Sequence, residues 1–482
     1  MRRCMPHKDL GRANSPGESA IVSGPSATST EMHCSARARW DGLILLGLGA
    51  ILFLVVGVSW ERISTLSMGD FKVAYYSARC LIQNGDPYDG NAVERVYHVE
   101  GREDPKAPVR NLLVMTRYFY LPSAFIVTVP FALLGFNAGH LLWMAFSAAG
   151  LILAGFLMWE ISAQYAPVLS GALIGFVLAN CLWIFMIGNS AAIAISLCTI
   201  GVWCFLRNRF VAAGILCLAL SLVLKPHDSG FVWLYFLVAG GVYRKRALQT
   251  FVATCLLSLP GILWVQYVSP HWMQEMRSNM SLFSTQADDS THGTVSIAGG
   301  STDSLVELQS VFDIFWNNPA LSSAITYALC GALLAVWLVV TMKSPASLQS
   351  ALLALATIAP LSMLPLYHWL HDTKLILLTI PACAMLWGIG GARGKLALLF
   401  STGYVAVTAD IPQTLLGFLT GRLSLSPDTA LGKVQFAIFA HSASWVLLLA
   451  SIFFLSVYTK DSLCSSASAM RIAPRCFPSK HI

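Results

Sequence analysis

Long apolar runs alternate with short polar links along most of the chain. Many of these runs approach the ~20 residues that an α-helix needs to cross the hydrocarbon core of a bilayer. The pattern gives thirteen candidate segments, whose ends are defined to within about 2–4 residues. They are residues 42–60, 120–136, 139–160, 167–186, 189–206, 211–225, 229–243, 248–268, 320–341, 347–367, 373–390, 397–418 and 434–457. Because lipid cannot form hydrogen bonds with the N–H and C=O groups of an irregular backbone, the pattern predicts an all-α polytopic membrane helix bundle.

The composition excludes an ordinary soluble protein. The chain is 56% hydrophobic and only 11% charged, whereas soluble domains carry roughly 25% charged residues. A soluble core cannot absorb that much apolar surface over 482 residues. We therefore expect an integral, multi-pass membrane protein.

Basic residues gather in the two tails and in three short links between apolar segments. They are Arg2, Arg3, Lys8, Arg12, Arg37 and Arg39, then Arg207 and Arg209, then Arg244, Lys245 and Arg246, then Arg393 and Lys395, and finally Lys460, Arg471, Arg475 and Lys480. By the positive-inside tendency, these parts face the cytoplasm. Segment 269–319 carries one basic residue, Arg277, against six acids, which indicates an external loop. Two cytoplasmic tails require an even number of crossings. Segment 120–136, interrupted by Pro122 and Pro130, is expected to dip into or lie beside the bundle, which leaves about 12 transmembrane helices.

These assignments divide the chain into three parts. Residues 1–40 are expected to form a disordered cytoplasmic tail, and residues 458–482 a second cytoplasmic tail. Residues 41–457 form the transmembrane domain, with external loops at about 61–119 and 269–319. The polar stretch before the first span is too long for a cleavable signal, so that span is expected to be an uncleaved anchor.

The sequence offers no sign of a bound cofactor. Only Cys80 among the twelve cysteines lies in an external loop, so no disulfide is expected. No Cys/His spacing indicates a zinc site, and the acids Asp288 and Asp289 lie among Ser, Thr and Gly, as in a solvated loop. No P-loop or Rossmann fingerprint indicates a nucleotide. We therefore expect no metal, no cofactor and no nucleic-acid partner.

The first external loop begins with a helical pattern. Its apolar positions are Phe71, Ala74, Tyr75, Ala78, Leu81 and Ile82, which share one face of a helix. The run Asn84-Gly85-Asp86-Pro87 is a strong stop signal. The pattern predicts a short amphipathic helix on the outer membrane surface, with Asp70 in its first turn.

The residues from Asp70 to Tyr88 carry a resemblance. They are Asp70, Phe71, Tyr75, Tyr76, Ala78, Leu81, Gly85, Asp86, Pro87 and Tyr88. The stretch resembles the hallmark of glycosyltransferase family 87, approximately D-F-x-x-Y-Y-x-A-A-x-x-L-x-x-G-x-D-P-Y. Weaker matches follow in order over about residues 42–400: Tyr120-Leu121-Pro122 with Pro130, Leu224-Lys225-Pro226, and the stretch from His368 to Leu375. Gly188-Asn189 falls where the family usually has Gly-Gln followed by Asn, so the polar residue differs.

The resemblance implies a fold and an activity. Family 87 belongs to the GT-C class of membrane enzymes, which use polyprenyl-phosphate sugars on the external membrane face. Its best-known members are similar to mycobacterial phosphatidylinositol mannoside mannosyltransferases. The resemblance implies transfer of a hexose, with mannose one candidate, to a lipid or glycan acceptor by an inverting displacement. The role of catalytic base falls on Asp70.

The chemistry of that transfer agrees with the candidate residues. A carboxylate can deprotonate the acceptor hydroxyl as it attacks, and fixed cations can stabilise the leaving phosphate. Lys225 and His227 are expected at an external helix end. His368 and His371 are expected at another, beside Asp372 and Lys374. The candidate substrate-binding residues are Tyr75, Tyr76, Arg79, Asn189, Lys225, His227, His368 and His371.

Each candidate has a structural alternative. Asp70 is equally suited to cap its helix, and Lys225 to reach the membrane surface from a helix end. His368 and His371 could serve as polar anchors at an interface. Arg79 could pair with Asp70 or Asp86, and Asp86-Pro87-Tyr88 reads as a turn.

Two alternatives concern the activity itself. A transporter or flippase of lipid-linked sugars is the second hypothesis, although such a path predicts ionisable residues at mid-bilayer depth in several spans. A ligase that transfers a whole glycan would share the external site. The ends of loop 269–319 are apolar and could form interfacial helices, with a mobile Thr285–Asp303 middle, so the loop is a candidate substrate lid.

Overall fold

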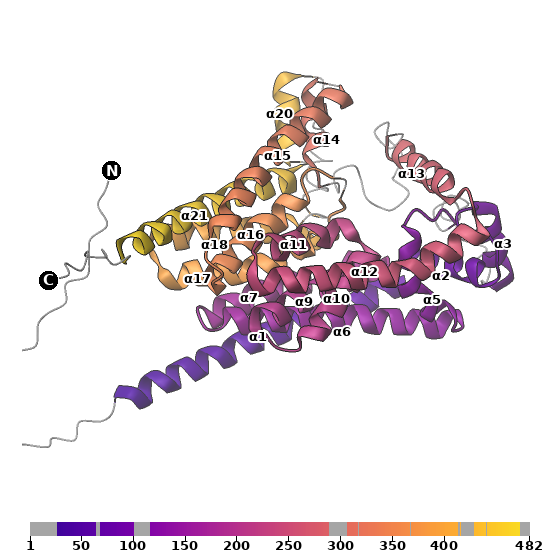
Figure 1. The fold of residues 1–482 in the computed structure, drawn as a ribbon. Helices are drawn as coiled ribbons and strands as arrows, with labels where there is room; N and C mark the ends of the chain where they lie inside the picture. The colour runs from indigo at the N-terminus through magenta and orange to yellow at the C-terminus, as the bar shows by residue number, and fades with distance from the viewer. Residues whose placement is uncertain are drawn as a thin grey trace, which may run out of the picture.

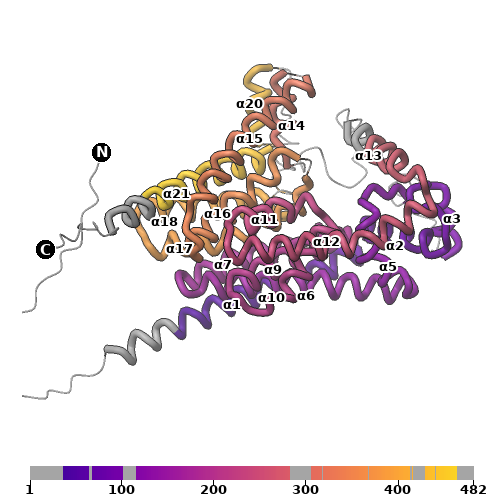
Figure 2. The backbone as a smooth tube through the Cα atoms, viewed as in Figure 1, coloured from indigo at the N-terminus to yellow at the C-terminus, as the bar shows by residue number. Residues whose placement is uncertain are grey.

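The computed structural model describes most of the chain as α-helix (Figure 1). The described residues are 27–63, 68–100, 116–288, 306–316, 318–366, 368–412, 415, 429–439 and 441–472. Within these ranges the fold is all-helical, with no strand. Figure 2 shows α9 (Ala191–Arg207), α10 (Val211–Leu224) and α12 (Gly241–Val268) side by side in the middle of the molecule.

Six described helices are long and apolar enough to cross a membrane. They are α1 (Ala27–Ile63), α6 (Phe136–Ser162), α12, α15 (Pro319–Lys343), the continuous η4 (Asp372–Thr379) and α17 (Ile380–Ile389), and α21 (Ser442–Ile472). Their length and apolar composition identify a helical integral membrane protein. The count of twelve spans goes beyond these six helices and stays a prediction.

The other predicted segments form shorter helices. They include η1 (Pro122–Ala124), α5 (Phe125–Ala132), α7 (Pro167–Ala179), α8 (Leu182–Met186), α9, α10, α11 (Pro226–Val238), α16 (Leu348–Ser362), α18 (Gly391–Val407) and α20 (Ala430–Phe439). Prolines 122, 167 and 226 stand at the first position of their helices, where the missing N–H costs nothing. Segment 120–136 becomes η1 and α5, too short to cross a bilayer, as its two prolines indicate. Segment 434–457 is divided between α20 and α21.

Two helices extend into the regions predicted as tails. Helix α1 begins at Ala27, inside the predicted tail 1–40, and α21 continues to Ile472, inside the predicted tail 458–482. The helices therefore extend beyond the predicted ends of the transmembrane domain, whose boundaries stay predictions. The nearest prolines are Pro25 and Pro474, so no helix breaker intervenes although the composition is polar. Residues 1–26 and 473–482 lie outside the described residues.

Glycines bring α1 and α7 into backbone contact. A Cβ atom on Gly49 of α1 would lie 2.1 Å from the carbonyl oxygen of Gly175 on α7, and one on Gly171 would lie 2.2 Å from that of Gly42. Only residues without a side chain permit this approach, as is common where membrane helices pack closely. The contact fixes the helix that leads toward Asp70.

The two predicted external loops contain further helices. The first loop forms α2 (Gly69–Ile82) and α3 (Gly90–Glu100), and the second forms α13 (Trp272–Asp288) and α14 (Leu308–Trp316) at its ends. Residues 289–305, the middle of the second loop, lie outside the described residues. In Figure 1 the start of α1 and the end of α21 lie at the left, whereas α2, α3 and α13 lie at the right.

Helix α2 does not lie on the surface as predicted. Ten of its fourteen residues are buried, among them Val73, Tyr76 and Cys80 outside the predicted apolar face. The predicted helix and its stop are confirmed, because α2 ends at Ile82 and Asn84 adopts a positive φ. The predicted surface location is wrong, because other elements cover α2 on several sides. Helices α3, α5 and α6, for example, pack against α2.

Candidate active site

The start of α2 is fixed against the turn that follows α8. The Met68 N–H donates to the carbonyl oxygen of Met186 (2.7 Å), and the Asp70 N–H donates to that of Ile187 (2.9 Å). The free N–H groups of a helix start thus find partners outside the helix. Met68 is the N-cap residue of α2 and no side chain caps the helix, so the carboxylate of Asp70 is available for another contact. The alternative that Asp70 caps its helix is therefore wrong.

Gly188 shapes the turn that faces Asp70. Its φ is +67°, and a Cβ atom there would lie only 2.9 Å from the Cβ atom of Phe71. Glycine alone fits both demands. The carbonyl oxygen of Gly188 accepts a hydrogen bond from Trp143 Nε1 (2.9 Å). The turn directs the next side chain, Asn189, toward Asp70.

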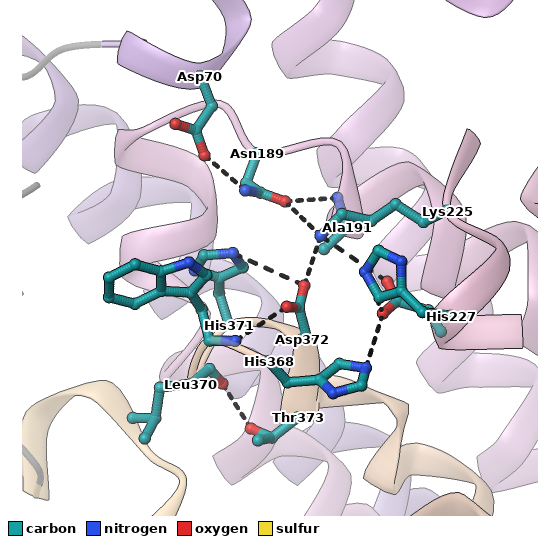
Figure 3. Close-up of polar contacts among 12 residues, drawn as sticks. Asp70, Asn189, Ala191, Lys225, His227, His368, Leu370, His371, Asp372 and Thr373 are labelled. Carbon is teal, nitrogen blue, oxygen red and sulfur yellow. Dashed lines mark hydrogen bonds and ion pairs between the residues drawn. The ribbon is translucent and has the colours of Figure 1, made fainter. Parts of the chain in front are cut away.

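Asn189 links Asp70 to Lys225. Its Oδ1 atom accepts from the Ala191 N–H (2.8 Å) and from Lys225 Nζ (3.2 Å), while Nδ2 donates to Asp70 Oδ2 (2.5 Å). Because two donors contact one end of the amide, its orientation is determined. The amide N–H must therefore face the Asp70 carboxylate (Figure 3).

Lys225 lies at the break between α10 and α11. Pro226 cannot continue the helix of α10, and the Lys225 ammonium turns inward, with the residue only 4% exposed. Its Nζ atom is 2.6 Å from Asp372 Oδ1 and 3.9 Å from Asp228 Oδ2. Asp372 Oδ2 also accepts from the Trp369 N–H (3.1 Å). Lys225 is thus the paired cation of a buried cluster, and the alternative that it reaches the membrane surface is wrong.

Three histidines complete the cluster. His227 Nε2 and His368 Nε2 lie 3.4 and 3.7 Å from Asp228 Oδ1, and His371 Nε2 lies 3.6 Å from Asp372 Oδ1. His368 and His371 are buried, so they are not interfacial anchors. Figure 3 shows the three imidazoles around the Lys225–Asp372 pair. We call this polar cluster, which comprises Asp70, Asn189, Lys225, His227, Asp228, His368, His371 and Asp372, the Asp70–His368 network.

The surroundings of Asp70 raise the pKa of its carboxyl group. Burial among protein atoms raises its pKa from 3.8 to about 6, while the Asn189 hydrogen bond and the Lys225 charge act in the opposite direction. A carboxyl with a pKa near the working pH is well suited to accept a proton and release it again. The side chain therefore has the properties of a general base.

A small cavity lies beside Asp70. Its volume is about 10 Å³, and Tyr118, Tyr120 and Ser190 contribute to its walls. That is room for about one water molecule or one hydroxyl group. A larger hollow of about 630 Å³ lies on α12, beside Arg244 and Lys245, and no residue of the network lines it.

The structure brings together six of the nine predicted site residues: Asp70, Asn189, Lys225, His227, His368 and His371. Tyr75, Tyr76 and Arg79 have other partners. Tyr75 Oη donates to the Leu134 carbonyl (2.7 Å), Tyr76 stacks on Phe136, and Arg79 forms a bidentate pair with Glu100. At about 100° per residue, these three positions lie roughly 120–180° around α2 from Asp70. The pairing of Arg79 with Asp70 or Asp86 is also wrong, because its partner is Glu100.

Two acids of the network were not predicted as site residues. Asp228 directly follows His227, and Asp372 directly follows His371. Each therefore sits next to a predicted phosphate-binding histidine within an apolar region, where an ionisable residue is costly. That cost is the signal that could have identified them. The turn interpretation of Asp86-Pro87-Tyr88 is confirmed, because Asp86 Oδ1 accepts from the Tyr88 N–H (2.9 Å).

Comparisons with models of protein families, with curated proteins and with solved structures gave no match. The resemblance to glycosyltransferase family 87 therefore stays a prediction.

Proposed function

We propose that this protein is a membrane glycosyltransferase that moves a hexose from a polyprenyl-phosphate carrier to a lipid or glycan acceptor. Asp70 is the base that takes the proton of the acceptor hydroxyl. One observation carries the proposal: the Asp70 carboxyl, with its raised pKa, faces a small cavity and connects through Asn189 to a buried lysine. This places a proton acceptor and a cation at the two ends of one hydrogen-bonded chain.

The cationic end suits the leaving group. When the sugar–phosphate bond breaks, negative charge develops on the phosphate, and a fixed cation in a dry site stabilises it. The Lys225 ammonium supplies a charged hydrogen-bond donor for such an anion. Asn189 would hold Asp70 at a constant distance from this end. In an inverting displacement the base and the leaving group lie on opposite sides of the sugar, and the network offers two separated ends for them.

The site belongs to helix breaks rather than to the middle of long helices. Asp70 and Asp372 each lie in the first turn of an element, and Asn189 and Lys225 lie in the links before α9 and α11. A transport path would instead require ionisable residues spread along several spans. With the positive-inside topology, this end is the external face of the plasma (inner) membrane. The architecture we propose is a GT-C-type bundle of about twelve spans.

The test is transfer by purified protein in lipid. Wild type and Asp70→Asn would receive radiolabelled polyprenyl-phosphate mannose and a total membrane lipid extract. The substitution preserves shape and removes the base. We expect transfer by wild type and a loss of about 100-fold or more in the variant, as for other general bases. Glu94→Gln is the matched control, because Glu94 is a partly exposed carboxylate on α3 outside the network.

Product analysis distinguishes the alternatives. A single added sugar supports the transferase, a translocated but unchanged donor lipid supports the flippase, and a transferred chain supports the ligase. Equal transfer by wild type and Asp70→Asn would remove Asp70 from the base role.

A further inference from the structure

Three potential metal ligands converge at the end of the network remote from Asp70. Asp228 Oδ1 lies 3.4 Å from His227 Nε2 and 3.7 Å from His368 Nε2. All three ligand atoms fall within 4.8 Å of one another. His227 and Asp228 open α11, whereas His368 precedes η4, so the fold joins positions 140 residues apart. No spacing motif in the sequence reveals the group, which is why we expected no metal.

The group is unsatisfied as it stands. Among the described residues, no donor forms a hydrogen bond with either carboxylate oxygen of Asp228. His368 Nε2 also has no hydrogen-bond partner there. The side chains of Asp228 and His368 are each 1% exposed, so water cannot readily compensate. Lys225 Nζ lies 3.9 Å from Oδ2, beyond hydrogen-bond distance, and a buried carboxylate without hydrogen bonds is costly. A proton or a cation close to Asp228 Oδ1 would remove this cost.

The orientation of His368 defines where that species belongs. Its Nδ1 atom is 2.9 Å from the Leu366 carbonyl oxygen, which can only accept a hydrogen bond. Nδ1 therefore carries the proton, and Nε2 of the neutral ring presents a lone pair to the Asp228 carboxylate. Metal-binding histidines commonly donate their other N–H to a backbone carbonyl in this way.

The distances also fit a small coordination sphere. Zinc binds histidine nitrogen and carboxylate oxygen at about 2.0–2.2 Å, so two ligands of a tetrahedron lie roughly 3.3–3.6 Å apart, close to the 3.4 and 3.7 Å observed here. Both histidines face Oδ1 of Asp228, whereas Lys225 faces Oδ2. The ammonium and a metal ion would therefore use different oxygens. When the carboxyl groups of Asp70, Asp228 and Asp372 are all ionised, they exceed the one ammonium by two negative charges, which one divalent ion balances.

We propose that His227, Asp228 and His368 bind a divalent transition-metal ion, with Zn²⁺ the best match. Three protein ligands leave a fourth position for water or an anionic oxygen, as in catalytic rather than structural zinc sites. The proposal concerns metal binding alone. It is measured without donor or acceptor, so its failure would leave the Asp70 proposal standing.

The experiment uses the full chain in detergent, with any affinity tag removed. Metal content is measured by mass spectrometry as purified and after chelation and titration with Zn²⁺. Co²⁺ then replaces zinc, because tetrahedral cobalt has a distinctive visible spectrum. We expect one equivalent of metal, a tetrahedral cobalt spectrum, and at least a tenfold weaker affinity in His368→Gln and Asp228→Asn.

His98→Gln is the matched control, because His98 and Glu94 form a similarly spaced but exposed pair without a second histidine. It should bind metal like wild type. The cobalt spectrum requires no variant, so it tests the site even if a substitution impairs folding. Absence of stoichiometric metal, or equal affinity in wild type, His368→Gln and Asp228→Asn, would overturn the proposal and leave a proton in the place of the metal ion.

Discussion

Lys225 and Asp372 form the closest ion pair of the network, and removing one partner should strongly destabilise the fold. The Nζ–Oδ1 distance is 2.6 Å, and both residues are nearly inaccessible to solvent. Lys225→Met keeps the aliphatic length and removes the charge. Asp372 would then be a buried carboxylate whose remaining contacts are the Trp369 N–H and the His371 ring.

The expected magnitude follows from that distance. At an effective dielectric constant of about 20, two unit charges 2.6 Å apart attract by about 6 kcal/mol. Desolvation of both groups offsets part of this attraction, and breaking such buried pairs typically costs about 3–5 kcal/mol. We expect a loss in this range for Lys225→Met and for Asp372→Asn. The double variant should be less destabilised than the sum of the two, by at least about 2 kcal/mol, since no uncompensated charge remains.

Unfolding in detergent, followed by tryptophan fluorescence, measures the four members of this cycle. Glu94→Gln serves as the surface control and should change stability by less than about 1 kcal/mol. Additivity of the two single variants within about 0.5 kcal/mol would refute the reasoning, because residues that do not interact behave additively.

Four further predictions concern Asp70 and helix α2, which carries it. Because the pKa of Asp70 is raised from 3.8 to about 6, the rate of sugar transfer should increase with pH through about 6 and then level off. Asn189→Ala removes a hydrogen bond that lowers this pKa, so the increase should occur at higher pH in that variant. The folded state holds this proton more tightly than the unfolded chain, so the stability contributed by Asp70 should fall as pH rises from about 4 to 6. Chemical unfolding measures this as the slope of the unfolding free energy against pH, and equal slopes in wild type and Asp70→Asn would contradict the prediction. Gly188→Ala should lower stability by more than about 2 kcal/mol, because it adds left-handed backbone strain of about 1–2 kcal/mol to crowding against Phe71; a melting temperature equal to that of wild type would contradict this. Arg79→Met should loosen α2 from α3 by removing the bidentate pair with Glu100, at a cost of about 1–2 kcal/mol given its partial exposure, and limited proteolysis of residues 68–100 should become faster.

The sequence predicted helices well because bilayer-spanning segments leave a strong apolar signal. The ends of the first and last helices were harder to predict. Polar residues before Trp40 and after Tyr458 suggested tails, yet local helix formation continues until a proline is reached. Solvent exposure was also misjudged for α2, since Val73 and Tyr76 are buried by partners distant in sequence. A periodic pattern reveals which face is most apolar, but not what covers the remaining faces.

The candidate site divides along similar lines. Asp70, Lys225 and the histidines could be found from their chemical types and their positions at helix ends. The connection between them could not, because it depends on the Gly188 turn and on Asn189, whose amide contacts residues 119 positions before it and 36 after it. Tyr75, Tyr76 and Arg79 belong to the same motif as Asp70, but a helix turns neighbouring positions in different directions. Their contacts indicate that they hold the helix in place.

The spread of the network along the chain has a consequence for how the protein is made. Lys225 leaves the ribosome 147 residues before its partner Asp372. At a synthesis rate of roughly 5–20 residues per second, about 7–30 s pass between the synthesis of Lys225 and that of Asp372. Asp228, only three residues away, is already present during this interval. We therefore expect Asp228 to serve as the counter-ion of Lys225 during membrane insertion, before Asp372 is synthesised. In the folded protein it remains beside the lysine.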